Sequence, residues 1–99
     1  MEEKVYRQSR LCRLLGNPIA FAVVHVLRES KELSPSEIAR AVGRSVSRVS
    51  HILAALRLAE VVRYKTDGRH ARYRLKHRHE TQQLLTALSR FIDSSSASK

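Results

Sequence analysis

Residues 36–58 read SEIARAVGRSVSRVSHILAALRL and predict two short helices joined by a tight turn. Gly43 is expected to take the left-handed conformation that ends the first helix. Ser45 is expected to cap the second helix, in which apolar residues recur at helical spacing. The outward residues near its start can all form hydrogen bonds: Ser47, Arg48, Ser50 and His51. A helix that buries one side and presents such groups at its N-terminal end indicates a helix-turn-helix, with residues 45–58 as the recognition helix.

Charge and composition indicate an anionic partner. The 99 residues, 42% of them hydrophobic, are enough for one domain with a modest core, so residues 1–99 are expected to form a single domain. Nineteen lysines and arginines against nine acids give a net charge of +10. From Arg63 to Arg78 the basic residues are interrupted by one acid, Asp67. A solubilising surface usually mixes both signs, so this clustering favours nucleic acid.

Other classes of protein find little support in the sequence. The single cysteine, Cys12, rules out an intrachain disulfide framework. The charged N-terminus and the lack of a long apolar run predict neither a signal peptide nor a membrane span, and hence a cytoplasmic protein. No paired carboxylates, nucleophile–base grouping or phosphate-binding glycine loop indicates an enzyme or a cofactor.

Local signals predict where the other helices begin and end. A first helix is expected over residues 3–15, with Cys12 as a small buried hydrophobe. Asn17 followed by Pro18 predicts an N-cap and first helical position, and Ser34 with Glu37 predicts a capping box. The last helix is expected from about residue 80 to 92, followed by a frayed tail over residues 94–99.

Two strand-like runs follow the helix-turn-helix. They cover residues 61–65 and 71–75 and flank an Asp67-Gly68 step, which is a hairpin signal. Alternation places Arg72, Arg74 and Lys76 on one face of the second strand and Tyr73 and Leu75 on the other. The fold class is therefore mainly α with a small β-hairpin, the combination that defines a winged helix-turn-helix.

From about residue 14 to 75 the chain resembles an ArsR/SmtB-type winged helix-turn-helix repressor. The resemblance is carried by Leu15-Gly16-Asn17-Pro18, by the helix-turn-helix and by the wing KTDGRHARYRL. MarR-type regulators share the fold but generally have longer chains. The resemblance implies a homodimer formed through the first and last helices, and a repressor that an inducer releases from DNA. Apolar residues of the last helix suit such an interface: Leu84, Leu85, Leu88, Phe91 and Ile92.

The resemblance also implies which residues read DNA. The family's Ser-x-Ser-x-x-Ser-His string is matched by Ser45, Ser47, Ser50 and His51. The chain departs from it with Val46 and Arg48, where the family often has Gln and Thr, and adds Arg44. Each of these features also has an alternative role that does not involve DNA. Ser45 could serve only as a helix cap, His51 could be a partly buried structural histidine, and the wing could be a charged edge that prevents strand pairing. The predicted DNA-binding residues are Arg44, Ser45, Ser47, Arg48, Ser50 and His51 in the helix and Arg69, His70 and Arg72 in the wing.

Metal sensing, common among ArsR-type proteins, is not predicted here. The Cys-x-Cys of the arsenic and cadmium/lead branches is absent from residues 32–36. The zinc-type site of the last helix would have His77 and His79 in its first pair, but Arg90 falls in the second pair and cannot ligate a metal. Two histidines alone make a weak site. No metal is therefore expected, and the inducer stays unassigned.

The functional prediction is a sequence-specific regulator of double-stranded DNA, of repressor type. Its recognition helix, residues 45–58, would enter the major groove, and its wing, residues 63–75, would contact the flanking backbone or minor groove. The alternative is a nucleoid-type architectural protein with little sequence preference.

Overall fold

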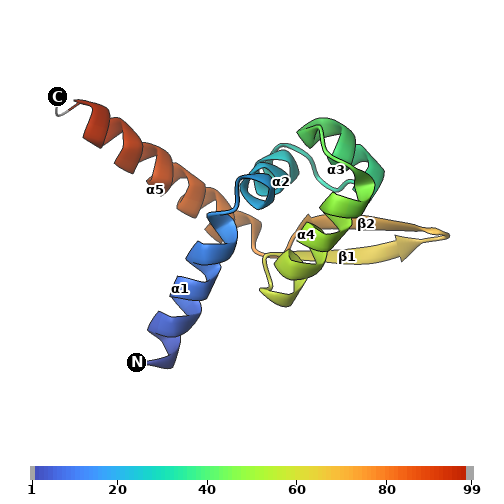
Figure 1. Cartoon of the computed structure of the whole chain (residues 1–99), viewed down its shortest axis with the longest axis horizontal. Coiled ribbons are helices and arrows are strands. Elements are labelled where there is room, and N and C mark those ends of the chain that lie inside the picture. Colours follow the sequence, from blue (N-terminus) through green and yellow to red (C-terminus); the bar gives the residue numbers. More distant parts are fainter. Residues whose placement is uncertain (1, 98–99) are drawn as a thin grey trace.

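The computed structural model describes residues 2–97, in which the chain forms helices and one β-hairpin. The two-stranded sheet is antiparallel and follows the helix-turn-helix directly (Figure 1). This order confirms the predicted winged helix-turn-helix. The elements are α1 (Glu3–Leu15), α2 (Pro18–Glu29), α3 (Pro35–Val42), α4 (Val46–Leu58), β1 (Val62–Asp67), β2 (His70–Leu75) and α5 (Arg78–Ala97).

Local caps explain where the helices start. The Asn17 side chain accepts hydrogen bonds from the amides of Ile19 and Ala20, at 2.9 and 3.1 Å, at the start of α2. Ser34 and Glu37 form the predicted capping box of α3. Gly43 ends α3 with a φ of +69°, a left-handed conformation that glycine adopts without strain. The short-range signals in the sequence therefore set the helix-turn-helix.

The C-terminal end of α4 has a turn that the sequence does not announce. The amide of Val61 donates to the carbonyl of Leu56 at 2.9 Å, and that of Glu60 to Arg57 at 3.0 Å. These two bonds form a Schellman motif, in which the residue after the cap is usually glycine. Here Glu60 takes that place with a φ of +65°, and its carboxylate pairs with Lys76 of the segment after β2.

One core joins α2, α3, α4 and the base of the hairpin. Among residues 78–96, α5 contributes a single fully buried residue, Leu85, and α1 contributes none. Across residues 2–96, no polar or charged side chain is buried. The buried residues are Ala20, Val23, Val24, Leu27, Ile38, Ala39, Val49, Leu53, Leu56, Val62, Leu75 and Leu85.

The two faces of the hairpin differ sharply in polarity. Tyr64 lies opposite Tyr73 on the inner face, and the Arg57 guanidinium of α4 lies 5.5 Å from the Tyr64 ring centroid. Arg63 lies opposite Arg74, and Lys65 opposite Arg72, on the outer face. The turn is tighter than predicted, because β1 continues to Asp67 and Gly68, at a φ of +64°, begins a two-residue loop. The hydrophobic inner face fixes this register, since a one-residue slip would turn it outward.

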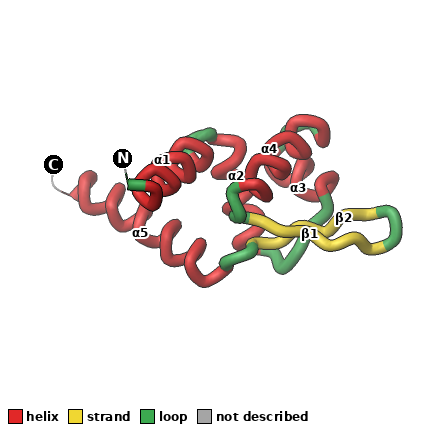
Figure 2. The backbone as a smooth tube through the Cα atoms, turned by 90° about the horizontal axis from the view of Figure 1, so that it is seen from below, coloured by secondary structure: helices red, strands yellow, loops and turns green. Residues whose placement is uncertain are grey.

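Helices α1 and α5 extend from the core at the end of the molecule opposite the wing (Figures 1 and 2). The prediction that Cys12 is buried was wrong for this single chain: its side chain is exposed, because α1 projects from the body and packs only its last turn against it. No single helix in residues 2–97 is long and apolar enough to cross a membrane. α1 and α2 pass that test only as a pair, bent by 90° at their junction.

α5 is longer than predicted. It runs from Arg78 to Ala97, whereas the sequence suggested an end near Ile92 and a frayed tail. Serines 94–96 continue the helix, since no glycine or proline ends it there and serine costs a helix only a fraction of a kcal/mol, about 0.5. Residues 98 and 99 lie outside the described part of the chain.

Candidate nucleic-acid interface

The N-terminal half of α4 presents its polar residues to solvent. Val49, Leu53 and Leu56 bury the inner side of the helix against the core. The residues predicted to read DNA lie on the opposite side and are all exposed: Ser47, Arg48, Ser50 and His51. Among the described residues, none of these four side chains makes a hydrogen bond or ion pair. This surface is therefore free to bind a ligand without first breaking an internal contact.

Arg44 and Ser45 lie at the turn before α4. The Ser45 hydroxyl accepts a hydrogen bond from the Arg48 amide at 3.1 Å, so it serves as the N-cap that the sequence predicts. The Arg44 guanidinium donates to its neighbour's carbonyl, that of Gly43, at 3.0 Å and remains exposed. His51 is exposed, which does not fit the alternative of a partly buried structural histidine.

The tip of the hairpin brings Arg69 and His70 together. Both are exposed, and neither has an internal side-chain partner among residues 2–97. The hairpin projects beyond the helices, at the end of the molecule farthest from α1 and α5 (Figure 2). A basic tip of this kind suits the phosphate-lined minor groove or backbone.

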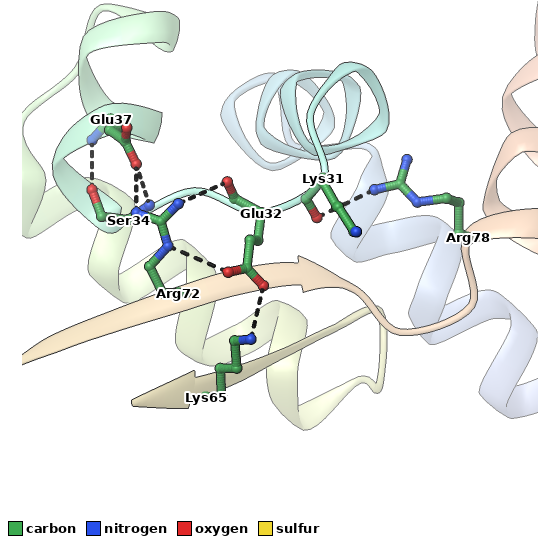
Figure 3. A network of polar contacts seen from close by, with 7 residues as sticks. All are labelled: Lys31, Glu32, Ser34, Glu37, Lys65, Arg72 and Arg78. Atoms are coloured by element: carbon green, nitrogen blue, oxygen red, sulfur yellow. Dashed lines mark hydrogen bonds and ion pairs between the residues drawn. The ribbon is translucent and has the colours of Figure 1, made fainter. Parts of the chain in front are cut away.

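Arg72 differs from the other predicted residues, because acidic groups of the protein surround it. Its guanidinium lies 3.3 Å from the Glu37 carboxylate and 3.5 Å from that of Glu32, and it also donates to the Glu32 carbonyl at 3.4 Å (Figure 3). Its side chain is 31% exposed. Lys65 reaches the other oxygen of Glu32 at 3.6 Å. The sequence marks Arg72 as a cation on the wing but does not reveal these partners.

Two basic residues on the outer face of the hairpin were not among the predicted set. Arg63 and Arg74 lie directly opposite each other, and neither has an acidic partner among the described residues. Like charges in such a pair repel, at a cost of roughly 0.2–1 kcal/mol. Strand alternation places both on the polar face and is the signal that could have found them.

Glu37 joins the capping box to the wing. The Ser34 amide, which donates to its carboxylate at 2.8 Å, lowers the pKa of Glu37 below its ordinary value of 4.5, and Arg72 adds to this effect. Because the folded-state pKa is lowered, this carboxylate stabilises the fold above its unfolded pKa. That contribution disappears as the pH falls through the folded pKa.

A Glu37→Gln protein should therefore melt at a lower temperature than the wild type at neutral pH. The gap should narrow as the pH falls from about 4.5 toward 2, because the wild-type carboxyl then becomes protonated and loses the same interactions. Thermal unfolding of both proteins across this range measures the gap. A gap that stays constant down to pH 2 would contradict the assignment.

Arg78, at the start of α5, closes the C-terminal end of α2. It donates to the carbonyls of Arg28, Leu27 and Ser30 at 2.9, 3.1 and 2.8 Å, and lies 3.5 Å from that of Lys31. These carbonyls point out of the helix end, where no further turn can satisfy them. The C-cap of α2 is Ser30 in an extended conformation, without a left-handed glycine. A cation at a helix C-terminus also complements the helix dipole.

Metal ligands do not gather in the part of the chain that the structure describes. No group of three or more histidine, cysteine or acidic side chains is placed to hold an ion within residues 2–97. His77 is exposed just before α5, and His79 is exposed in its first turn.

A helix-turn-helix packed on one core, a basic hairpin and an exposed polar face on α4 define a winged helix-turn-helix domain. The sequence profile of the HVO_A0114 family matches residues 17–81, and the chain belongs to that family. The chain is also similar to the HTH-type transcriptional regulator KmtR of Mycobacterium tuberculosis, with 36% identity over 87 residues. That match covers 88% of this chain and 66% of KmtR, so the chain spans slightly less than two thirds of that relative.

Solved structures share the fold over most of the chain. The transcriptional repressor BigR of Xylella fastidiosa is 26% identical with a TM-score of 0.78, covering 92% of this chain and 91% of its own. The homodimeric domain of Mb0332 of Mycobacterium bovis, a possible ArsR-family regulator, is 21% identical with a TM-score of 0.80. It covers 92% of this chain and 82% of its own. Together these relatives confirm the ArsR-type resemblance that the sequence predicts.

Proposed function

We propose that this chain is a homodimeric, sequence-specific regulator of double-stranded DNA that acts as a repressor. The observation that carries the proposal is the exposed, unpartnered polar and basic side of α4. Helix α4 and the hairpin with its basic tip lie in the half of the molecule away from α5 (Figure 1). In this proposal residues 45–58 of each subunit enter successive major grooves, about one helical turn apart. Residues 1–99 act as one domain, in the cytoplasm, without catalytic activity or a cofactor, and the inducer stays unassigned.

The proposed contacts are of two kinds: contacts to base edges that select sequence, and contacts to the DNA backbone or minor groove that position the protein. Arg44 and Arg48 suit the acceptor edge of guanine, and Ser47, Ser50 and His51 add shorter hydrogen-bonding groups. Ser45 acts through its cap, because its hydroxyl is already bonded to the Arg48 amide. Arg69 and His70 hold the backbone or minor groove without selecting sequence.

Exposed apolar side chains on α1 and α5 support the proposed dimer. α1 presents Val5 and Tyr6, each 47% exposed, and α5 presents a longer apolar row. Phe91 and Ile92 in that row are 74% and 63% exposed, although apolar groups of this size are usually shielded from water. The homodimeric Mb0332 domain shares this fold, which supports the same arrangement.

A second candidate is a nucleoid-type protein that binds DNA with little sequence preference. The observation in its favour is Val46, an exposed apolar residue in the first turn of α4, where it offers no hydrogen bond to a base. Selection of bound duplexes from a random library tests both candidates. Sequence-specific regulation predicts a recovered, roughly palindromic operator that binds at least about 10³-fold more tightly than random DNA at physiological salt. An equal affinity for both at two salt concentrations would support the architectural candidate.

An Arg48→Ala protein is expected to lose about 1–3 kcal/mol of operator binding and to accept more bases at the position that Arg48 reads. The reason is that its guanidinium is exposed on α4 and has no internal partner to release. Arg69→Gln is the matched comparison: it should weaken operator and random DNA alike and lower the salt slope by about one. Fluorescence anisotropy at several salt concentrations measures both. An unchanged operator affinity for Arg48→Ala would remove this residue from the reading set.

A further inference from the structure

We infer that Glu32 and Arg72 are positioning residues that hold the wing at a fixed angle to α3, and that Arg72 is not a phosphate contact. The inference rests on the proposed function and deepens it. Glu32 lies in the loop between α2 and α3, and Arg72 lies in the middle of β2. Figure 3 shows the Arg72 guanidinium between the carboxylates of Glu32 and Glu37.

These contacts connect three separate parts of the fold. Arg72 links the wing to the capping box of α3 through Glu37 and to the α2–α3 loop through Glu32. The Glu32 side chain, 24% exposed, bridges both strands of the hairpin because Lys65 of β1 approaches its second oxygen. The next residue, Leu33, exchanges backbone hydrogen bonds with Tyr73 at 3.0 and 2.7 Å. The wing is therefore attached to the helix-turn-helix by its backbone at Tyr73 and by the side chains of Arg72 and Lys65 on its outer face.

The attachment at Tyr73 lies several residues back along β2 from the tip that is proposed to touch DNA. From Tyr73 to His70 the strand extends about 10 Å, at roughly 3.3 Å per residue. Among the described residues, no hydrogen bond or ion pair joins residues 66–71 to the helices. A rotation of the wing by about 10° at this point would move the tip by about 2 Å over that length. Such a shift is enough to break hydrogen bonds between the wing and a backbone that α4 already fixes.

Charge alone predicts the opposite effect of a mutation at Glu32. Removing an acid near a DNA-binding surface, and releasing Arg72 and Lys65 from it, should raise affinity for any DNA. Removing a positioning residue should lower affinity for the operator, because α4 and the wing no longer fit it together. Glu29→Gln is a matched control, since Glu29 pairs only with its neighbour Arg28 among the described residues and is 71% exposed.

The test compares Glu32→Gln and Glu29→Gln on the selected operator and on random DNA of the same length, by fluorescence anisotropy. Stoichiometric titration fixes the active concentration, so partial unfolding does not register as weaker binding. We expect Glu32→Gln to bind the operator with about fivefold lower affinity than the wild type, and random DNA with unchanged or higher affinity. Glu29→Gln should change its affinity for both DNAs by the same factor. Equal shifts for Glu32→Gln, or a rise on the operator, would overturn the inference.

Arg72→Gln supplies the second readout. As a positioning residue it should weaken operator binding without lowering the salt slope, whereas Arg69→Gln lowers that slope by about one. A slope for Arg72→Gln that falls as much as for Arg69→Gln would make Arg72 a phosphate contact and overturn the inference. A wild-type protein that binds no selected sequence more tightly than random DNA would overturn the proposed function together with the inference. The variant results above overturn the inference alone, so the two failures can be distinguished.

Discussion

A Leu88→Glu/Phe91→Glu protein is expected to be a folded monomer that has lost about 10²–10⁴-fold of the wild-type operator affinity. Both side chains lie on the exposed side of α5, so the new carboxylates enter no core. In the proposed dimer they would be buried against a second copy, where unpaired charge is strongly unfavourable. One recognition helix would then bind alone, without the gain from a linked second half-site.

Sedimentation velocity and operator titration measure the two parts of this expectation. Gln83→Glu/Thr86→Glu is the matched control, because it adds the same charge at exposed positions on the other side of α5. That control should remain dimeric and should bind as the wild type does, apart from a small uniform loss from the added acids. A wild-type protein that sediments as a monomer, or a Leu88→Glu/Phe91→Glu protein that sediments as a dimer, would refute the proposed interface.

Short-range signals account for the parts of the fold that the sequence predicts well. Asn17, Ser34 and Ser45 each cap a helix through an amide two or three residues away. Gly43 ends α3 through its own left-handed φ, which depends on no distant residue. The hairpin follows from Asp67-Gly68 and alternating residues on either side. Helical periodicity likewise predicts which side of α4 faces outward, and the exposed Arg48 follows from it.

Contacts between distant residues explain what the sequence could not predict. As a basic residue in a wing, Arg72 suits a phosphate contact or an ion pair equally well. Its partners Glu37 and Glu32 lie 35 and 40 residues away in the chain, and only the folded chain brings them to it. The exposure of Cys12 depends on how α1 leaves the body, and the left-handed Glu60 breaks the glycine preference on which such predictions rely. Composition and spacing carry no signal for any of these features.

Among these contacts between distant residues, those of Arg78 are expected to have the largest effect on stability. An Arg78→Ala protein should lose about 2–3 kcal/mol of unfolding free energy, since a charged donor to several carbonyls is removed at once. The carbonyls at the end of α2 would then be left without a partner or would need water. The unfolding free energy of Arg78→Lys should lie between those of the wild type and Arg78→Ala, because an ammonium keeps the charge at the helix end but cannot span the same acceptors.

Lys31→Ala is the matched control for this change. It removes a cation at the same end of α2 but leaves every carbonyl that Arg78 contacts in place, and the Lys31 side chain is exposed. Its unfolding free energy should stay within about 0.5 kcal/mol of the wild type. Urea unfolding followed by circular dichroism, at one fixed protein concentration, measures all four proteins under the same conditions. If Arg78→Ala is no less stable than Lys31→Ala, the guanidinium at this helix end contributes only its charge, and the proposed cap of α2 is wrong.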